Sequence, residues 1–525
     1  MIRVDVFLPL GFDGQMLKDR CEERLGRKIE PSVSLRLLRL AVDASDVKSI
    51  CYKAAVILSL DEKSEKHLIQ RRRATAYEEA PFSLPPTKAF TTRPVVVGLG
   101  PCGLFAALIL AECGARPIVL ERGEDVDRRV LSVEGFYRGG ELDEENNIQF
   151  GEGGAGSFSD GKLKVGSMTP EKRKILETLI WAGAPARILY DAAAHVGTDL
   201  LRGIVKKIRQ HIEDLGGTVL FGAKLTDIRI QAGAVRGVTY RKDGAAHELV
   251  TDSLLLATGH SARDVFPMLA SHGIPLEARG FGIGVRVEHP RAHIDRMIYG
   301  ENPPRELGAA SYRFVTHLEN GRSVYSFCMC PGGSVVAATS VRGAVVTNGM
   351  SLHARDGENS NAAILVSVTP ADFGGTALGG LAFQEKYEKL AFSLARDYRA
   401  PAIRMEDFLA GRVSQSLGEV KPSYPRGVIL SSLDDCLPSF AIQSLKAAIP
   451  AFDEYKKGFY LPDALLTGVE TRTTSPIRIP RDESGQTLKG LYPCGEGAGY
   501  AGGIISSAVD GVLAARKLIQ NHEKD

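Results

Sequence analysis

The sequence is poor in cysteine and has no long apolar run. Only eight cysteines occur in 525 residues, too few for a disulfide scaffold, and none has the paired C-x-x-C spacing of a zinc site. No uninterrupted apolar stretch reaches the roughly 18 residues of a membrane-spanning helix. The first residues also lack the apolar core of a signal peptide. We therefore expect a cytoplasmic protein in a reducing compartment, with no membrane partner.

The sequence also lacks a strong net charge and several catalytic motifs. Lys and Arg number 65 against 63 Asp and Glu, a net charge of +2, so no overall field attracts nucleic acid. The HExxH, GxSxG and P-loop patterns are absent, which argues against a zinc protease, a serine hydrolase and a P-loop NTPase. We predict no metal site, and any charge-based recognition must be local.

What is present is typical of a large globular protein with several domains. Hydrophobic residues make up 44% and charged residues 24% of the chain, close to the globular average. Residues 1–80 combine apolar runs with two helical patterns, which predicts an N-terminal α+β module of ferredoxin-like fold. Residues 81–94 contain four prolines and predict a linker.

From residue 94 the chain alternates apolar strands, glycine turns and helical patterns, which predicts an α/β fold with a parallel sheet. We assign residues 94–275 to the first part of a Rossmann-like, nucleotide-binding domain and residues 471–525 to its C-terminal return. Residues 276–470 mix strand-like runs with a helical stretch. They predict an inserted, β-rich α+β domain that caps the site and binds substrate.

The strongest motif is a glycine turn between a strand and a helix. The strand Val95–Val97 leads into Gly98, Gly100 and Gly103, and a second strand ends at Glu121. Glycines at these places permit a sharp turn, the approach of a pyrophosphate to the backbone, and close packing of helix on strand. The N-terminus of the helix attracts phosphate, and a carboxylate at the second strand accepts from ribose hydroxyls. This predicts FAD or NAD rather than NADP.

Three further segments extend the predicted nucleotide site. Residues 151–162 are rich in glycine and offer backbone donors to a phosphate or a flavin, although a flexible surface loop is an equal alternative. Residues 254–262 form an apolar strand that ends in a small polar turn, and residues 491–503 lead into a second helix N-terminus. An NAD enzyme does not need this C-terminal return, so FAD is favoured. No second GxGxxG in strand and helix context follows residue 163, so NAD(P)H would visit only transiently.

Together these strings resemble the family of uncharacterised FAD-dependent dehydrogenases within the glutathione-reductase-like flavoprotein superfamily. The resemblance rests on GEGGAGSFSDGKL (151–163), FGIGVRVEHP (281–290), CMCPGG (328–333), NGMS (348–351), VETRTTSPIRI (469–479) and GEGAGYAGGI (495–504). It implies FAD as the cofactor and supplies no substrate. The residues that it and the glycine turns assign to FAD are Gly98, Gly100, Pro101, Cys102, Gly103, Glu121, Arg122, Gly153, Gly154, Ala155, Ser157, Thr258, Gly259, Gly495, Glu496, Gly502, Gly503 and Ile504.

The catalytic residues are less well defined, because a flavin carries the redox chemistry itself. His289 and His260 are candidate general acids or bases, with a structural role as the alternative. Cys328 and Cys330 form a C-x-C pair whose redox use is disfavoured, because the disulfide would be strained. Arg472 and Arg478, with Arg481 nearby, would neutralise cofactor phosphates or bind an anionic substrate.

The sequence therefore predicts an FAD-dependent oxidoreductase. We expect a dehydrogenase or reductase that passes a hydride or electrons between a small, unidentified substrate and the flavin, with NAD(P)H as a transient partner. Two alternatives remain: an NAD-dependent dehydrogenase that uses the same glycine turn, or a flavin-retaining protein whose N-terminal module binds a partner or RNA. The basic cluster Arg71–Arg73 favours the last of these.

Overall fold

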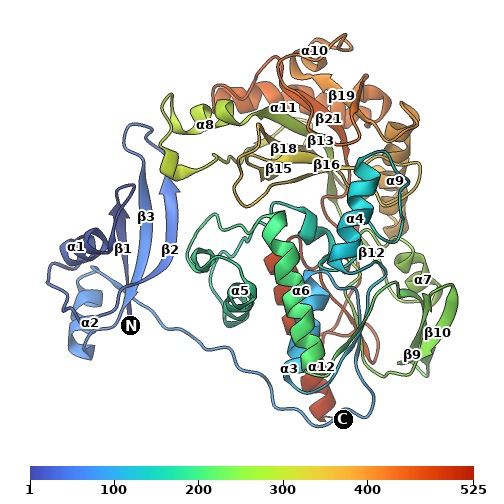
Figure 1. Ribbon diagram of the computed structural model, residues 1–525, viewed down its shortest axis with the longest axis horizontal. Helices are drawn as coiled ribbons and strands as arrows, with labels where there is room; N and C mark the ends of the chain where they lie inside the picture. Colours follow the sequence, from blue (N-terminus) through green and yellow to red (C-terminus); the bar gives the residue numbers. More distant parts are fainter. Residues whose placement is uncertain (525) are drawn as a thin grey trace.

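A parallel five-stranded sheet brings together strands that lie far apart in the chain. The structure is a computed structural model that describes residues 1–524 (Figure 1). The strand order is β23-β11-β5-β6-β7, and neighbouring strands run parallel. The strands are β5 (Val95–Val97), β6 (Ile118–Leu120), β7 (Thr218–Leu220), β11 (Leu254–Leu256) and β23 (Leu491–Pro493).

The side chains of this sheet alternate between two apolar layers. Val96 and Leu255 belong to a core formed with helices, whereas Val95 and Leu254 belong to a second core on the other face. A strand that is buried on both faces must be apolar throughout, and β5 and β11 meet this requirement. The helices of the first core are α3 (Pro101–Glu112), α5 (Pro170–Ala182), α6 (Thr198–Asp214) and α12 (Ile504–Lys524).

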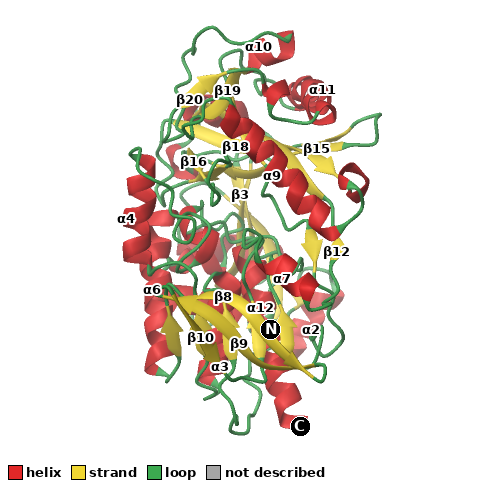
Figure 2. Cartoon of the chain, turned by 90° about the vertical axis from the view of Figure 1, so that its right-hand side faces the viewer, coloured by secondary structure: helices red, strands yellow, loops and turns green. Residues whose placement is uncertain are grey.

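The opposite face of this sheet is covered by a small antiparallel sheet and a short helix. The strands follow the order β10-β9-β8 (Figure 2). Their apolar side chains, together with those of the helix, complete the second core. The elements are β8 (Lys224–Gln231), β9 (Ala234–Lys242), β10 (Ala245–Leu249) and α7 (Val265–Ser271).

A seven-stranded sheet lies above the parallel sheet in Figure 1 and has its own apolar core. The order is β14-β15-β18-β13-β21-β19-β20. Its central strand β13 (Phe281–Pro290) is buried almost throughout, because it pairs on both sides. The other strands are β14 (Val315–His317), β15 (Ser323–Cys330), β18 (Asn359–Val368), β19 (Ala400–Arg404), β20 (Val428–Leu430) and β21 (Leu465–Glu470).

Helices and short strand pairs surround the seven-stranded sheet and link it to the parallel sheet. The pair β16 (Ser334–Ala337) and β17 (Thr347–Met350) lies beside it, and β12 (Glu277–Ala278) pairs with β22 (Ile477–Arg478) where the chain passes between the two sheets. The helices are α4 (Val126–Tyr137), α8 (Arg291–Tyr299), α9 (Ala377–Ser393), α10 (Met405–Ala410) and α11 (Ser439–Tyr455).

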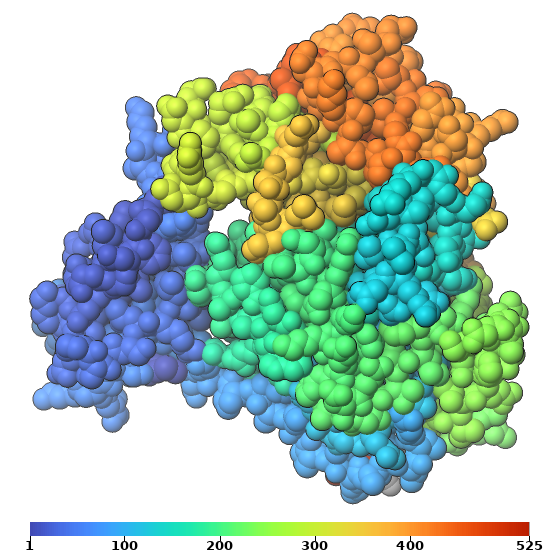
Figure 3. Space-filling view, in the orientation of Figure 1, coloured from blue at the N-terminus to red at the C-terminus, as the bar shows by residue number. Residues whose placement is uncertain are grey.

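The first 76 residues form a separate four-stranded antiparallel sheet. Its order is β2-β3-β1-β4, and the elements follow one another as β-α-β-β-α-β. This unit forms a lobe beside the rest of the chain (Figure 3), and an extended segment leads from it to β5 (Figure 1). The elements are β1 (Ile2–Leu8), α1 (Gly14–Leu25), β2 (Arg36–Asp43), β3 (Cys51–Leu58), α2 (Glu62–Gln70) and β4 (Thr75–Ala76).

The structure confirms the α/β class. Strands and helices lie close to where the sequence patterns place them: β5 coincides with Val95–Val97, and β13 contains the apolar run that begins at Phe281. No helix within residues 1–524 is both long and apolar enough to cross a membrane.

The close packing of α12 on α3 yields a stability prediction. A Cβ atom at Gly511 would lie 2.1 Å from the carbonyl oxygen of Cys102, so Gly511→Ala must push the two helices apart. We expect it to lower the free energy of unfolding by about 1–3 kcal/mol, measured by urea denaturation. Gly135→Ala in α4 is the control, since a Cβ there meets nothing within 4 Å. Equal stability of the two variants would contradict the predicted contact.

Candidate functional site

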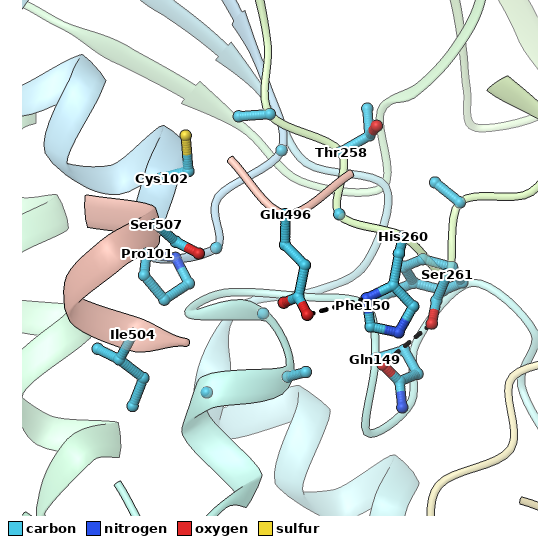
Figure 4. A pocket seen from close by; sticks show the side chains of 18 of the residues that line it. Pro101, Cys102, Gln149, Phe150, Thr258, His260, Ser261, Glu496, Ile504 and Ser507 are labelled. Carbon is cyan, nitrogen blue, oxygen red and sulfur yellow. Dashed lines mark hydrogen bonds and ion pairs between the residues drawn. The ribbon is translucent and has the colours of Figure 1, made fainter. Parts of the chain in front are cut away.

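A cavity of about 380 Å³ lies where the carboxyl edge of the parallel sheet meets the seven-stranded sheet. In α/β folds with a parallel sheet, ligands bind at this edge. Val97 and Leu120 line the cavity from the ends of β5 and β6, while Phe327 and Glu470 line it from β15 and β21. The cavity is therefore built by segments spread over more than four hundred residues of sequence, from Val97 to Ser507, some of which are shown in Figure 4.

The first wall is the glycine turn after β5. Gly98 has φ of +98°, in the left-handed region that glycine favours. A Cβ at Gly103 would lie 1.8 Å from the carbonyl oxygen of Gly98, so only glycine allows α3 to begin this close to the strand. Gly100 lines the cavity, and a Cβ there would meet only the Cα of Gly154, at 3.7 Å. The missing side chain at Gly100 therefore keeps this part of the cavity open.

Glu121 connects three loops through its carboxylate. Its Oε2 accepts from the N–H of Leu99 at 2.7 Å, and its Oε1 accepts from those of Gly123 and Gly151, each at 2.9 Å. The residue is 4% exposed and lines the cavity. Besides its predicted role toward a ribose, Glu121 thus holds the first glycine turn against the glycine-rich loop, a role that the sequence did not reveal.

The glycine-rich loop and the start of α12 form the opposite wall. A Cβ at Gly156 would lie 3.4 Å from side-chain atoms of both Pro101 and Ile504, so the loop is adjacent to the first turns of two helices. Both helix starts line the cavity together with Gly502 and Gly503 (Figure 4). The two glycine turns, about 400 residues apart in sequence, thus face one space.

Most residues that the sequence assigned to FAD line this cavity. They are Gly98, Gly100, Pro101, Cys102, Glu121, Arg122, Gly154, Ala155, Thr258, Gly259, Glu496, Gly502, Gly503 and Ile504. Gly103, Gly153, Ser157 and Gly495 lie behind them. Each of these four is packed against another part of the wall; at Gly153, for example, a Cβ would lie 1.9 Å from Ser157 Oγ.

Three of the catalytic candidates line the cavity: His260, Cys328 and Arg472. His260 Nδ1 lies 3.5 Å from Glu496 Oε1, and its buried Nε2 has no hydrogen-bond partner among the described residues (Figure 4). This imidazole has one nitrogen near a carboxylate and the other available to a ligand.

The other three candidates are corrected by the structure, because none of them lines the cavity. His289 is fully buried and its Nε2 lies 2.8 Å from the carbonyl oxygen of Phe459. Burial lowers the pKa of His289 to about 4, so the imidazole is neutral near pH 7 and has no access to substrate. Arg478 stacks on the ring of Tyr500, 4.9 Å from its centroid, and Cys330 is buried behind Cys328.

Arg481, the third member of the predicted arginine group, does not line the cavity either. Its guanidinium forms an ion pair with Asp510 of α12, with nitrogen-to-oxygen distances of 2.6 and 3.0 Å. It also stacks on Tyr500, 3.7 Å from the ring centroid. Arg481 therefore anchors the last helix rather than a ligand, and only Arg472 of the three reaches the cavity.

Arg472 belongs to a buried charge cluster with Glu388 and Arg263. The Glu388 carboxylate is fully buried and accepts from both guanidiniums at distances between 2.7 and 3.0 Å. Burial opposes this charge, but the two arginines outweigh it and lower the pKa of Glu388 to about 2. Sequence reasoning missed Glu388, because it lies 84 residues from Arg472 on α9 and no motif marks it.

A second polar group occupies the cavity wall toward the seven-stranded sheet. Glu470 and Cys328 line the cavity, and the carboxylate of Glu470 accepts from two nitrogens of the fully buried Arg286. Burial raises the pKa of Glu470 to about 7, against the opposing effect of Arg286. Glu470 lies in a string that carried the family resemblance, but no local pattern indicates that it faces a cavity.

Cys328 has an unusual backbone and electrostatic setting. Its φ is +40°, at a register shift between β15 and β18. The Cys330 thiol donates to the carbonyl oxygen of Cys328 at 3.3 Å. Hydrogen bonding with the Cys330 side chain, together with the nearby charges of Lys162 and Arg286, holds the pKa of the Cys328 thiol well below its ordinary value, against the effect of burial. The same pairing and burial raise the pKa of Cys330.

We therefore expect Cys328 to be the reactive thiol of the pair. Iodoacetamide at pH 7 should alkylate Cys328 before Cys330 in the FAD-free protein, because the thiolate is the reacting form. Peptide mapping by mass spectrometry gives the order of labelling. Lys162→Met should slow the labelling of Cys328 at pH 7 by removing a stabilising cation. Faster labelling of Cys330 would contradict the assignment.

The Glu388 cluster gives a prediction about pH. A depressed pKa stabilises the folded state above the unfolded value of about 4.5, and this stabilisation is lost as pH falls from there to about 2. Glu388→Gln should therefore cost about 3 kcal/mol of unfolding free energy at pH 7, and the difference from wild type should shrink below pH 4.5. Urea denaturation at several pH values measures this. The exposed Glu454→Gln is the control, for which no such trend is expected.

The chain is similar to proteins found among curated sequences and among solved structures. An uncharacterized protein of Clostridium beijerinckii is 44% identical over 534 residues, covering 99% of each chain. Among solved structures, the Escherichia coli quinol fumarate reductase FrdA is 13% identical, with 83% of this chain and 71% of that chain covered and a TM-score of 0.38. The 3-ketosteroid-Δ4-(5α)-dehydrogenase of Rhodococcus jostii is 13% identical, with 82% and 98% covered and a TM-score of 0.34.

A family model gives the clearest result. Residues 280–473 match the model described as FAD-dependent protein, C-terminal domain-like. The matched range contains the seven-stranded sheet together with Cys328, Glu470 and Arg472 of the cavity wall. With the full-length likeness to the C. beijerinckii protein, this match shows that the chain belongs to a family of FAD-dependent flavoproteins.

Proposed function

We propose that this chain is an FAD-dependent oxidoreductase that binds its cofactor along the cavity. The observation that carries the proposal is that two glycine turns, each at the start of a helix, line the same cavity together with a strand-end carboxylate, Glu121. The site fits FAD because it is open where a side chain would block it, at Gly100 and Gly502, and because both helix starts offer backbone N–H groups.

Each part of the cofactor has residues suited to hold it. The start of α3, with Gly100 and Pro101, would hold the pyrophosphate, and Glu121 would accept from the ribose hydroxyls with the lone pairs that its three backbone donors leave free. Thr258 and Gly259 would hold the middle of the cofactor from the end of β11. The remaining proposed contacts are Cys102, Arg122, Gly154, Ala155, Glu496, Gly503 and Ile504, with Gly103, Gly153, Ser157 and Gly495 supporting them from behind.

The domain assignment follows from this site. Residues 94–275 and 471–525 would form the FAD-binding domain, and residues 276–470 the substrate domain that caps it. The strand order β2-β3-β1-β4 supports a ferredoxin-like assignment for residues 1–80. The N-terminal unit contributes no residue to the cavity wall.

The residues of the chain have clear tasks in the proposed reaction. When bound, FAD supplies two-electron redox chemistry. His260 is the residue best placed to exchange a proton with substrate, since its Nε2 lacks a partner within the described chain and Glu496 lies beside its Nδ1. Arg472 is held by Glu388, so its guanidinium presents a fixed positive charge to the cavity.

The alternatives from the sequence have less support. An NAD-dependent dehydrogenase gives no reason for residues 496–507 to return to the cavity beside the first glycine turn. A role in binding a partner or RNA rests on the N-terminal unit alone. We propose NAD(P)H as a transient electron donor. Anaerobic mixing of the purified, FAD-loaded protein with NADH or NADPH tests this. Bleaching of the flavin absorbance supports an oxidoreductase that uses NAD(P)H. An unchanged flavin spectrum with both would contradict the role of NAD(P)H as electron donor.

Gly100→Val tests the cofactor site directly. Gly100 has φ of −72° and ψ of −178°, which valine adopts readily, so the fold should tolerate the change. The new side chain would occupy the space proposed for the pyrophosphate. We expect the FAD content after reconstitution, measured by visible absorbance, to fall at least about tenfold, with apoprotein unfolding unchanged.

Gly203→Val in α6 is the matched control, because a Cβ there meets nothing within 4 Å. It should bind FAD as the wild type does. The proposal is wrong if Gly100→Val retains full FAD content, or if the wild-type protein gains no flavin absorbance on reconstitution.

A further inference from the structure

The cavity wall formed by residues 160–164 carries two lysines whose charges the cofactor assignment does not use. Leu163 donates its N–H to the carbonyl oxygen of Ala194 and is buried in a core. Its neighbours Lys162 and Lys164 both line the cavity. The alternation of an extended segment thus places the two amines on the cavity side and the leucine on the other.

Lys162 is the more unusual of the two. Its Nζ is buried and has no hydrogen-bond partner among the described residues. The nearest carboxylate oxygen, Oδ2 of Asp160, is 3.5 Å away. Each oxygen of Asp160 also accepts a hydrogen bond from the guanidinium of Arg355, so Lys162 shares this carboxylate with an arginine.

The charges around this wall do not balance. Glu470, the other carboxylate at this end, is held by Arg286 through two hydrogen bonds. Lys164 has a nearby aromatic ring instead of a carboxylate, with its Nζ 5.5 Å from the centroid of Phe327. Each of these carboxylates accepts hydrogen bonds from an arginine, so neither lysine has a carboxylate of its own. The Cys328 thiol, whose pKa Lys162 helps to lower, offsets only part of the positive charge of the two lysines.

A buried ammonium without a hydrogen-bond acceptor is costly, and a ligand oxygen would relieve the cost. Phosphate is a poor candidate, because the glycine turns already provide for the phosphates of the proposed cofactor at the start of α3. The ring of Phe327 adds an apolar surface beside the two amines. The wall thus combines a point of positive charge with a flat apolar patch.

We propose that this end of the cavity is the substrate subsite and that the substrate is a small carboxylic acid. Its carboxylate accepts hydrogen bonds from Lys162 and Lys164, and its apolar part lies against Phe327. The inference rests on the proposed function, since it supplies the substrate class for the same cavity. In it, Lys162 and Lys164 are binding residues that set specificity, and they take no part in electron transfer.

The experiment compares a carboxylate with its neutral analogue on the FAD-loaded protein. Benzoate and benzamide have similar size and shape but differ in charge. Each is titrated while the visible flavin spectrum and the thermal unfolding temperature are recorded. We expect benzoate to bind at least about tenfold more tightly than benzamide, as for a charged hydrogen bond. Because a bound ligand raises the thermal unfolding temperature, the affinities of benzoate and benzamide can also be compared in protein that holds no flavin.

Variants identify the residue responsible. Lys162→Met should weaken benzoate binding at least about tenfold, and Lys162→Arg should largely retain it, while both keep the wild-type FAD content. Lys224→Met is the control. Lys224 also lines the cavity, but its Nζ is already paired with Glu145 and Asp264. Its loss should leave benzoate binding unchanged.

Three results would overturn the inference. They are equal binding of benzoate and benzamide, unchanged benzoate affinity in Lys162→Met, and loss of FAD from Lys162→Met and Lys162→Arg alike. The last would make Lys162 a cofactor ligand. Failure of the proposed function is distinct from these results, because it shows as an absence of flavin from the wild-type protein before any titration.

Discussion

The cavity depends on one buried carboxylate that joins the two main sheets. Glu388 comes from α9, beside the seven-stranded sheet; Arg263 follows β11 of the parallel sheet, and Arg472 follows β21. A buried charge is tolerated only when it is paired and its hydrogen bonds are satisfied. Here both carboxylate oxygens are engaged, and Ser340 accepts from Arg472 at 2.6 Å. Removing Glu388 leaves two buried guanidiniums without their carboxylate, so this cluster ties segments of the two sheets together.

Glycine has a different role from these charges. At Gly98, Gly103 and Gly511 the absence of a side chain lets helices approach strands or each other more closely than any other residue allows. At Gly100 and Gly502 it leaves space inside the cavity. Gly98, Gly103 and Gly511 therefore set the positions of the helices around the cavity, whereas Gly100 and Gly502 keep the cavity free of side chains. A long ligand with phosphates in its middle suits such a space, since backbone N–H groups can reach it without intervening side chains.

Hydrophobic periodicity and glycine spacing predicted those strands, turns and helices that are determined by neighbouring residues in the sequence. The strand, turn and helix around Gly98 follow from hydrophobic periodicity and glycine spacing, and most residues assigned from the motifs line the cavity. No local pattern around His289 indicated that its imidazole is fully buried, with Nε2 at the carbonyl oxygen of Phe459. Glu388 and Glu470 were missed as site residues because their roles arise from partners 84 and 184 residues away, and no spacing rule connects them. The prediction that Arg478 and Arg481 face the ligand has a related weakness. Their proximity in sequence to a glycine turn does not reveal that Arg478 contacts Tyr500 and that Arg481 pairs with Asp510.

The N-terminal lobe is fastened to the main body by a backbone bridge. Leu40 of β2 donates to the carbonyl oxygen of Tyr190 and accepts from the N–H of Ala192. A few residues later the same strip of chain, through Ala194, holds the N–H of Leu163, the neighbour of Lys162. Residues 190–194 thus form main-chain hydrogen bonds with the N-terminal unit on one side and with the cavity-lining segment on the other. The N-terminal unit and the cavity wall are therefore connected through main-chain hydrogen bonds as well as through the proline-rich linker.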